Sequence, residues 1–205
     1  ENSTNIEGTT NTENSAKENK DENIQNNQIS NESEENNMYS TGKHHAEIVV
    51  KNYGTIALEL DADVAPITVE NFANLVNEGF YNGLTFHRII SGFMIQGGDP
   101  LGNGTGGSSK TIKGEFASNG VKNSISHVRG TISMARSSMP NSASSQFFIV
   151  HQDSTFLDGK YAAFGTVTSG MEVVDKICAD TAVEDDNGTV AKNNQPVIEK
   201  ITIID

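Results

Sequence analysis

Residues 86–99, FHRIISGFMIQGGD, combine one cation and one amide with a run of apolar side chains. The cation is Arg88, the amide is Gln96, and Gly97 and Gly98 follow where we expect the chain to leave a strand. No serine or cysteine stands beside a base here, and no two carboxylates form an acid–base pair. These residue types favour a site that binds and donates hydrogen bonds over one that attacks a bond.

Two later segments carry a similar mixture of aromatic and polar residues: SMARSSMPNSASSQFFIV (133–150) and FLDGKYAAFG (156–165). Successive side chains of a strand point to opposite faces of the sheet. The adjacent pair Phe147 and Phe148 therefore requires that both faces are buried, or that one face lines a pocket. Taken alone, these aromatic residues are equally compatible with a core.

The sequence lacks the motifs of nucleotide-binding, hydrolase and metal sites. The stretch GNGTGG (102–107) matches G-x-G-x-x-G, but a polar, glycine-broken segment follows it in place of a helix, so we interpret it as a long flexible loop. There is no phosphate-binding lysine loop, nucleophile elbow or zinc-protease motif. His87, His127 and His151 have no metal-ligand spacing, and we expect each to be a hydrogen-bonded structural residue. We therefore expect neither metal nor cofactor.

The first 45 of the 205 residues differ in composition from the rest. They contain eleven Asn and nine Asp or Glu with few large apolar side chains, so we predict a disordered leader or tether, followed by a folded domain over 46–205. Of the total charge of −13, about −6 lies in this leader. An acidic chain is a poor candidate for binding nucleic acid or anionic lipid. The leader favours a membrane-tethered, extracytoplasmic location, with the cytoplasm as the alternative, and no apolar run is long enough to span a membrane.

The folded part reads as many short strands with two isolated helices. Alternating apolar residues predict a hairpin over 46–60 with a turn at 52–54. Apolar spacing predicts a helix that begins at Pro66 and ends near Gly79, and a second helix over 170–178. Further strands are expected at 86–90, 93–96, 130–135, 146–151, 162–167 and 196–205. This order is typical of a mainly β protein, either a closed antiparallel barrel or a sandwich. The one cysteine, Cys178, is predicted to be a buried apolar residue.

Residues 46–205 resemble the cyclophilin-type peptidyl-prolyl cis-trans isomerases. The run F-H-R-x-I-x-x-F-M-I-Q-G-G-D, the stretch SQFFI and the stretch FLDGKYAAFG carry the resemblance. It implies an eight-stranded closed antiparallel β-barrel capped by two α-helices. It also implies a rotamase, an isomerase that acts as a chaperone in protein folding, and its closest pattern is bacterial.

The resemblance also assigns site residues. It implies that Arg88 is the catalytic arginine and that Gln96 supports it and binds substrate backbone. The apolar proline pocket would be lined by Phe93, Met94, Phe148 and Leu157. The peptide groove would contain Ala135, Arg136 and Gln146, with His87 beside the arginine and Phe156 and Tyr161 at the rim.

The sequence departs from well-known members at the rim. Phe156 stands where many have Trp, Tyr161 where many have His, and Arg136 where many have Asn. Loss of the indole removes a hydrogen-bond donor and contact area, so we expect weak binding of cyclosporin-type ligands.

The expected reaction is rotation about X-Pro bonds in proline-containing peptides and unfolded proteins. Such rotation makes and breaks no bond, which agrees with the absence of a nucleophile, a base and a metal. The alternative is a binding module or chaperone that holds proline segments and catalyses only incidentally. We expect a monomer.

Overall fold

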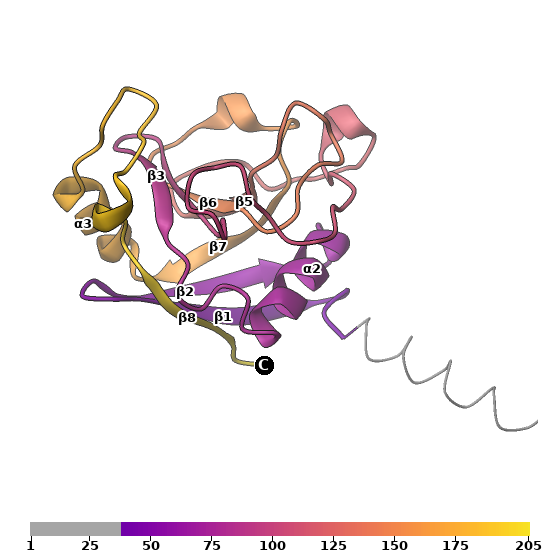
Figure 1. The fold of residues 1–205 in the computed structure, drawn as a ribbon. Helices are drawn as coiled ribbons and strands as arrows, with labels where there is room; N and C mark the ends of the chain where they lie inside the picture. Colours follow the sequence, from indigo (N-terminus) through magenta and orange to yellow (C-terminus); the bar gives the residue numbers. More distant parts are fainter. Residues whose placement is uncertain (1–37) are drawn as a thin grey trace, which may run out of the picture. The chain divides into compact units, whose positions relative to one another are not determined.

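The computed structural model describes residues 38–205, and these form one β structure with two α-helices (Figure 1). The predicted leader lies for the most part outside the described residues. The strands are β1 (Lys43–Val50), β2 (Gly54–Asp61), β3 (Phe86–Ile90), β4 (Met94–Gly97), β5 (Thr131–Met134), β6 (Phe147–Val150), β7 (Ala163–Ser169) and β8 (Ile198–Ile203). The helices are α2 (Pro66–Asn77) and α3 (Met171–Asp180). No helix in this part of the chain has the length and apolar character needed to cross a membrane.

The eight strands form one antiparallel, curled sheet in the order β3-β4-β6-β5-β7-β2-β1-β8. The edge strands β3 and β8 meet through a single bridge between Thr85 and Val197, flanked by backbone hydrogen bonds. The expected eight-stranded barrel-like fold is therefore confirmed, but its ladder closes through this bridge and not through a continuous strand pair. Strand β1 begins at Lys43, three residues before the predicted boundary.

Both predicted helices are present, for the reasons that the sequence suggested. Pro66 occupies the first turn of α2, where a missing N–H costs nothing. Gly79 adopts a left-handed conformation just after the helix. In Figure 1, α2 and α3 lie at opposite ends of the curled sheet, with α2 packed on β8 and β2, and α3 packed on β2.

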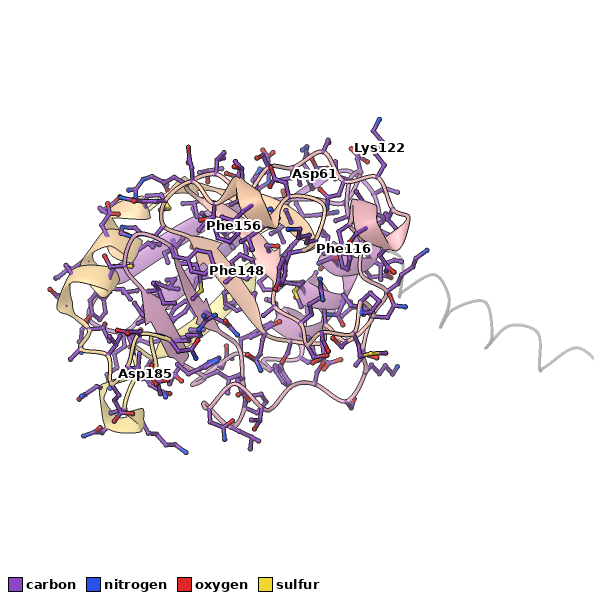
Figure 2. All side chains as sticks on the ribbon, turned by 90° about the horizontal axis from the view of Figure 1, so that it is seen from above. Asp61, Phe116, Lys122, Phe148, Phe156 and Asp185 are labelled. Carbon is purple, nitrogen blue, oxygen red and sulfur yellow. The ribbon has the colours of Figure 1, made fainter. Side chains whose placement is uncertain are left out.

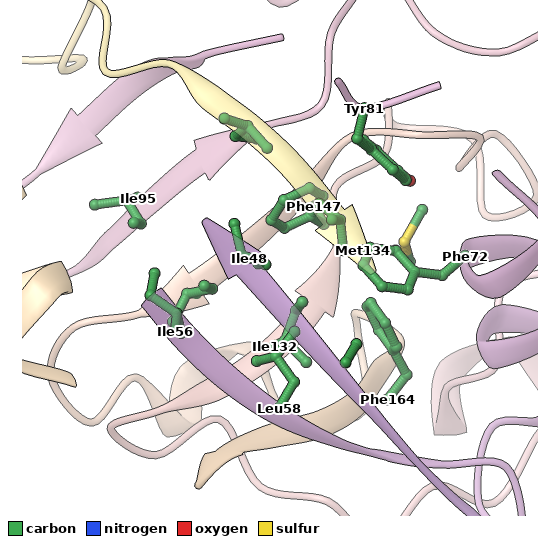
Figure 3. Packing of buried hydrophobic residues seen from close by; sticks show 14 of the residues in the cluster. Ile48, Ile56, Leu58, Phe72, Tyr81, Ile95, Ile132, Met134, Phe147 and Phe164 are labelled. Atoms are coloured by element: carbon green, nitrogen blue, oxygen red, sulfur yellow. The ribbon is translucent and has the colours of Figure 1, made fainter. Parts of the chain in front are cut away.

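Aromatic side chains from a helix and several strands fill the main core (Figure 3). Phe72 of α2 is fully buried, and its ring centroid lies 5.7 Å from that of Phe147 on β6 and 5.3 Å from that of Phe164 on β7. Burying a side chain of this size stabilises the fold by about 1.5–3 kcal/mol. Cys178 is also buried, as predicted, and burial raises the pKa of its thiol to about 11.

Candidate active site

A second, smaller apolar cluster lies on the opposite face of the strands that build the main core. It contains the buried side chains of Met94, Phe148, Val150 and Leu157. Phe147 points into the main core while its neighbour Phe148 belongs to this cluster, as strand alternation requires. In β4, Ile95 likewise packs in the main core between Met94 and Gln96, which face the other way. The expected division of these strands into a core face and a pocket face is therefore confirmed.

Phe93 packs against the same cluster, although it does not belong to a strand. We expected it to begin the strand, yet it lies in the turn between β3 and β4, where its N–H donates to Ile90 O at 2.9 Å. Because Phe93 precedes the strand, the alternation rule does not apply between it and Met94. Both side chains can therefore line one pocket, which a continuous strand would not allow.

Arg88 stands at the edge of this apolar pocket and is held by two residues. Its Nη1 donates to Gln96 Oε1 at 3.2 Å, while Nε and Nη2 donate to Asn187 O and Oδ1 at 2.8 and 3.1 Å. An arginine has five N–H donors. Among residues 38–205 three are engaged, which leaves one N–H on each terminal nitrogen without a protein acceptor, and Arg88 lines the groove. Partial burial lowers the pKa of Arg88, with Tyr161 and Asp185 opposing, but an arginine stays protonated.

A chain of amides continues from Gln96 into the neighbouring glycine loop. Gln96 lies directly opposite Arg88 in the β3–β4 register. Its Nε2 donates to Gln146 Oε1 at 2.9 Å, and Gln146 Nε2 donates to the carbonyl oxygens of Gly104 and Gly106. Gln96 thus accepts from Arg88 without neutralising it, as predicted, and its orientation is fixed by a second glutamine.

Arg88, Gln96 and most of the apolar cluster line one open groove of about 820 Å³. Gln146, which was predicted to lie in this groove, lines an adjoining hollow with Gln96 and Gly104. Its apolar end is formed by Phe93, Met94, Phe148, Leu157 and Tyr161, and Ala135 and Arg136 lie along it. Its polar end, past Arg88, runs between the 101–105 loop and residues 187–195. The groove therefore pairs a ring-sized apolar pocket with a fixed cation. Among the described residues no cluster of His, Cys, Asp and Glu has the arrangement of a metal site.

Comparison with protein families identifies the family to which this fold and groove belong. Residues 45–204 match the family described as "Cyclophilin type peptidyl-prolyl cis-trans isomerase". The chain belongs to this family. It is a peptidyl-prolyl cis-trans isomerase, as the sequence predicted.

Bacterial relatives support the assignment. The chain is 51% identical over 128 residues to a peptidyl-prolyl cis-trans isomerase of Helicobacter pylori, an alignment that covers 62% of this chain and 76% of that protein. It is 46% identical over 158 residues to a probable isomerase of Brucella suis, covering 71% and 76%. The expected similarity to bacterial members of the family is thus confirmed.

Solved structures agree on the fold. A cyclophilin-type isomerase of Cryptosporidium parvum superposes with a TM-score of 0.70 at 30% identity, covering 80% of this chain and 99% of that one. A second structure from the same organism, solved in the presence of the dipeptide Ala-Pro, has a TM-score of 0.69 at 32% identity.

Beneath the apolar pocket, this cyclophilin contains a Ser–His–Asp arrangement in which Ser133 and His127 are buried and Asp158 is exposed. His127 lies 2.8 Å from Asp158 Oδ1 through Nδ1 and 2.9 Å from Ser133 Oγ through Nε2. Ser133 is fully buried, so no substrate can reach it as a nucleophile. The imidazole instead stacks on Phe148, with ring centroids 6.0 Å apart and planes at 19°. The arrangement supports the floor of the pocket, and burial lowers the pKa of His127 although Asp158 opposes the shift.

Of the rim residues, Arg136 and Tyr161 line the groove, whereas Phe156 packs on Phe93 beside it. The Arg136 guanidinium sits 4.7 Å from the Tyr161 ring centroid and 4.8 Å from that of Phe116, and donates to Lys160 O. Phe156 is 63% exposed, and its ring centroid lies 5.5 Å from that of Phe93. Arg136 is therefore stacked and anchored, and contributes a planar surface to the groove wall. Phe148 and Phe156 are labelled in Figure 2.

The histidine predictions hold for two of three residues. His127 is bonded as described, and His151 accepts from Gly92 N and lies 3.0 Å from Asp175. His87 is 4% exposed and lines the groove, yet neither ring nitrogen has a partner among residues 38–205. The prediction of a hydrogen-bonded residue is therefore wrong for His87. Its burial lowers its pKa, with Asp99 raising and Arg88 lowering it, and this favours the neutral imidazole.

The glycine loop 102–107 is held more firmly than the sequence suggested. The carboxylate of Asp99 accepts backbone N–H groups from Leu101, Asn103 and Gly104. Burial alone would raise the pKa of Asp99, but these bonds and one to Gly106 lower it overall. Gly102 and Gly104 have the expected positive φ. The interpretation of 102–107 as a loop is confirmed, and Asp99 supplies an internal anchor that the sequence did not reveal.

Asn187 is a site residue that the sequence did not predict. It holds Arg88 across 99 positions of the chain, from a segment that pairs with the free edge of β3. There Ile89 N donates to Gly188 O and Val190 N donates to His87 O. The turn signal Asp-Asn-Gly (186–188) marks a loop, but nothing in the local sequence says which strand that loop meets.

Proposed function

We propose that this cyclophilin accelerates X-Pro rotation by donating hydrogen bonds from Arg88 to a proline held over Phe148. The supporting observation is the pair of unengaged N–H groups on a guanidinium whose other donors are fixed by Gln96 and Asn187. One N–H can hold the proline carbonyl while the other reaches the prolyl nitrogen.

The nature of the barrier explains why one cation suffices. Amide resonance creates a rotation barrier of about 18–20 kcal/mol. As the bond twists, the prolyl nitrogen becomes pyramidal and gains a lone pair that the planar amide lacks. A donor aimed at this nitrogen binds the twisted state better than either planar state, which is the condition for catalysis.

The apolar wall would fix one side of the rotating bond. Phe93, Met94, Phe148 and Leu157 offer a surface for the pyrrolidine ring. The same surface excludes water, which strengthens the contact between Arg88 and the substrate. Gln96 orients the guanidinium without a negative charge that would compete for it.

We propose unfolded, proline-containing protein segments as substrates and a monomer as the working form. The open groove, which continues on both sides of Arg88, has room for residues flanking the proline. Extracytoplasmic tethering through the leader stays a prediction from composition.

The decisive experiment compares Arg88→Ala with the exposed control Lys200→Ala in an X-Pro peptide assay. We expect Arg88→Ala to lower kcat/KM by about 10² or more, on the order of 3 kcal/mol for one such donor, and to leave the fold intact. Lys200→Ala should match wild type. Full activity of Arg88→Ala would refute the mechanism. If peptide binding persists while catalysis is lost, the two functions of the groove are separable.

A further inference from the structure

A chain of hydrogen bonds runs from helix α3 to the turn that carries Phe93. Asp175 of α3 accepts two bonds from Arg129, at 2.7 and 2.8 Å, and its Oδ1 lies 3.0 Å from His151 Nε2. On the other side of the imidazole, Nδ1 accepts from Gly92 N at 2.8 Å. Gly92 directly precedes Phe93 in the β3–β4 turn.

The bond directions define the tautomer of His151. A backbone N–H can only donate, so Nδ1 must present its lone pair to Gly92. The proton therefore lies on Nε2 and points at Asp175. The hydrogen bonds from Arg129, with a contribution from His151, lower the pKa of Asp175, so this carboxylate is charged and holds the tautomer in place.

The same imidazole residue also holds Phe93 through the backbone, since His151 N donates to Phe93 O at 2.8 Å. Phe93 is only half-buried and lies outside the main core, so core packing does not fix it. Its known neighbours are the pocket residues and the exposed ring of Phe156. The Gly92 bond therefore constrains this wall of the pocket together with the two backbone bonds of Phe93, to Ile90 O and from His151 N, and it is the one that depends on the His151 side chain.

We propose that His151, oriented by Asp175 and Arg129, is a positioning residue that sets the Phe93 wall of the proline pocket. The proposal rests on the role given above to Phe93 as part of that wall. Because the wall grips the ring in the planar and the twisted states alike, its displacement weakens binding more than turnover. Arg88, which acts on the twisted state, affects turnover instead.

The test uses the full-length protein and measures kcat and KM separately with an X-Pro peptide. His151→Leu removes the acceptor and leaves the Gly92 N–H unpaired, so we expect KM to rise about fivefold to tenfold with kcat nearly unchanged. His151→Asn, whose Oδ1 can accept from Gly92 N, should restore the wild-type KM. His45→Asn is the matched control, because His45 pairs with Asp205 in an exposed histidine–carboxylate pair on β1.

The split between kcat and KM separates a positioning role from a structural one. A purely structural role of His151 would lower the active fraction, and hence the apparent kcat, at constant KM. That result would overturn the proposal, as would a wild-type KM for His151→Leu.

Phe93→Ala separates this inference from the proposed function. If Phe93→Ala raises KM but His151→Leu does not, the positioning role of His151 is wrong while the pocket stands. If Phe93→Ala itself leaves KM unchanged, then Phe93 is no part of the substrate wall, and both assignments fail.

Discussion

Phe147 and Phe148 are neighbours on one strand, yet they belong to regions with opposite requirements. Phe147 is enclosed by Phe72, Tyr81 and Phe86 with no exposed surface. Phe148 is nearly as buried, but it packs on the buried His127 on one side and faces an open groove on the other. Burial alone therefore does not separate a structural aromatic residue from a functional one. What distinguishes Phe148 is that one of its faces is left for a ligand.

The largest expected effect is on the main-core side of this pair. Phe147→Ala leaves a cavity among close-packed rings, so we expect a loss of about 3–5 kcal/mol in the free energy of unfolding. Activity per folded molecule should change little at low temperature. Denaturant unfolding measures the loss; a decrease below about 1 kcal/mol would contradict the assignment of Phe147 to the core.

The reverse pattern is expected for Phe148→Ala. Its cavity opens into the groove and can fill with water, so the loss of stability should be about 1–2 kcal/mol, smaller than for Phe147. The proline ring loses its floor, worth about 1.5–3 kcal/mol of apolar contact, so kcat/KM should fall about tenfold to a hundredfold. Near-wild-type kinetics would remove Phe148 from the pocket.

A smaller effect, on the pH dependence of stability, is expected at His127, which stacks on Phe148. Burial lowers its pKa in the folded state. Its contribution to stability is thus complete above the unfolded-state pKa and is lost as the pH falls towards the folded-state pKa, with a limiting slope of about 1.4 kcal/mol per pH unit for one proton. His127→Asn should have a flatter stability profile between pH 7 and 5 in thermal unfolding. An unchanged slope would mean that other groups dominate, of which buried His87 is the first candidate.

The smallest expected effect is at the exposed rim. Phe156 offers contact area but no hydrogen-bond donor, so a cyclosporin-type ligand should bind more weakly here than to Phe156→Trp, by about tenfold. Calorimetric titration of both proteins measures the ratio. Equal affinities would show that the rim does not contribute a donor to such ligands.

The parts of the site that follow from short-range rules were predictable from the sequence. Period-two alternation separates Ile95 from Met94 and Gln96, and a tight hairpin puts Gln96 opposite Arg88. The resemblance assigned the functional roles. Residue types alone could not distinguish the pocket Phe and Met residues from core residues, or Arg88 from an exposed surface charge.

The parts that depend on distant packing were not predictable. Asn187 reaches Arg88 only because the 188–190 segment pairs with the edge of β3, and no local pattern specifies that partner. Phe93 shares a side with Met94 because the strand starts one residue later than its apolar run. Among residues 38–205 His87 has no hydrogen-bond partner, and this likewise depends on which distant segments pack near it.

The burial of Cys178 gives the molecule a built-in probe of its own motion. It is the one thiol in the chain, it lies on the inner side of α3, and its pKa of about 11 keeps it protonated at neutral pH. Cys178 is 8% exposed, at a hollow that it lines together with Ile89 and Ile90, so a thiol reagent should react slowly in the closed fold and faster when α3 detaches from the sheet. Since α3 also carries Asp175, the rate of alkylation would count the openings of the helix that anchors the pocket wall.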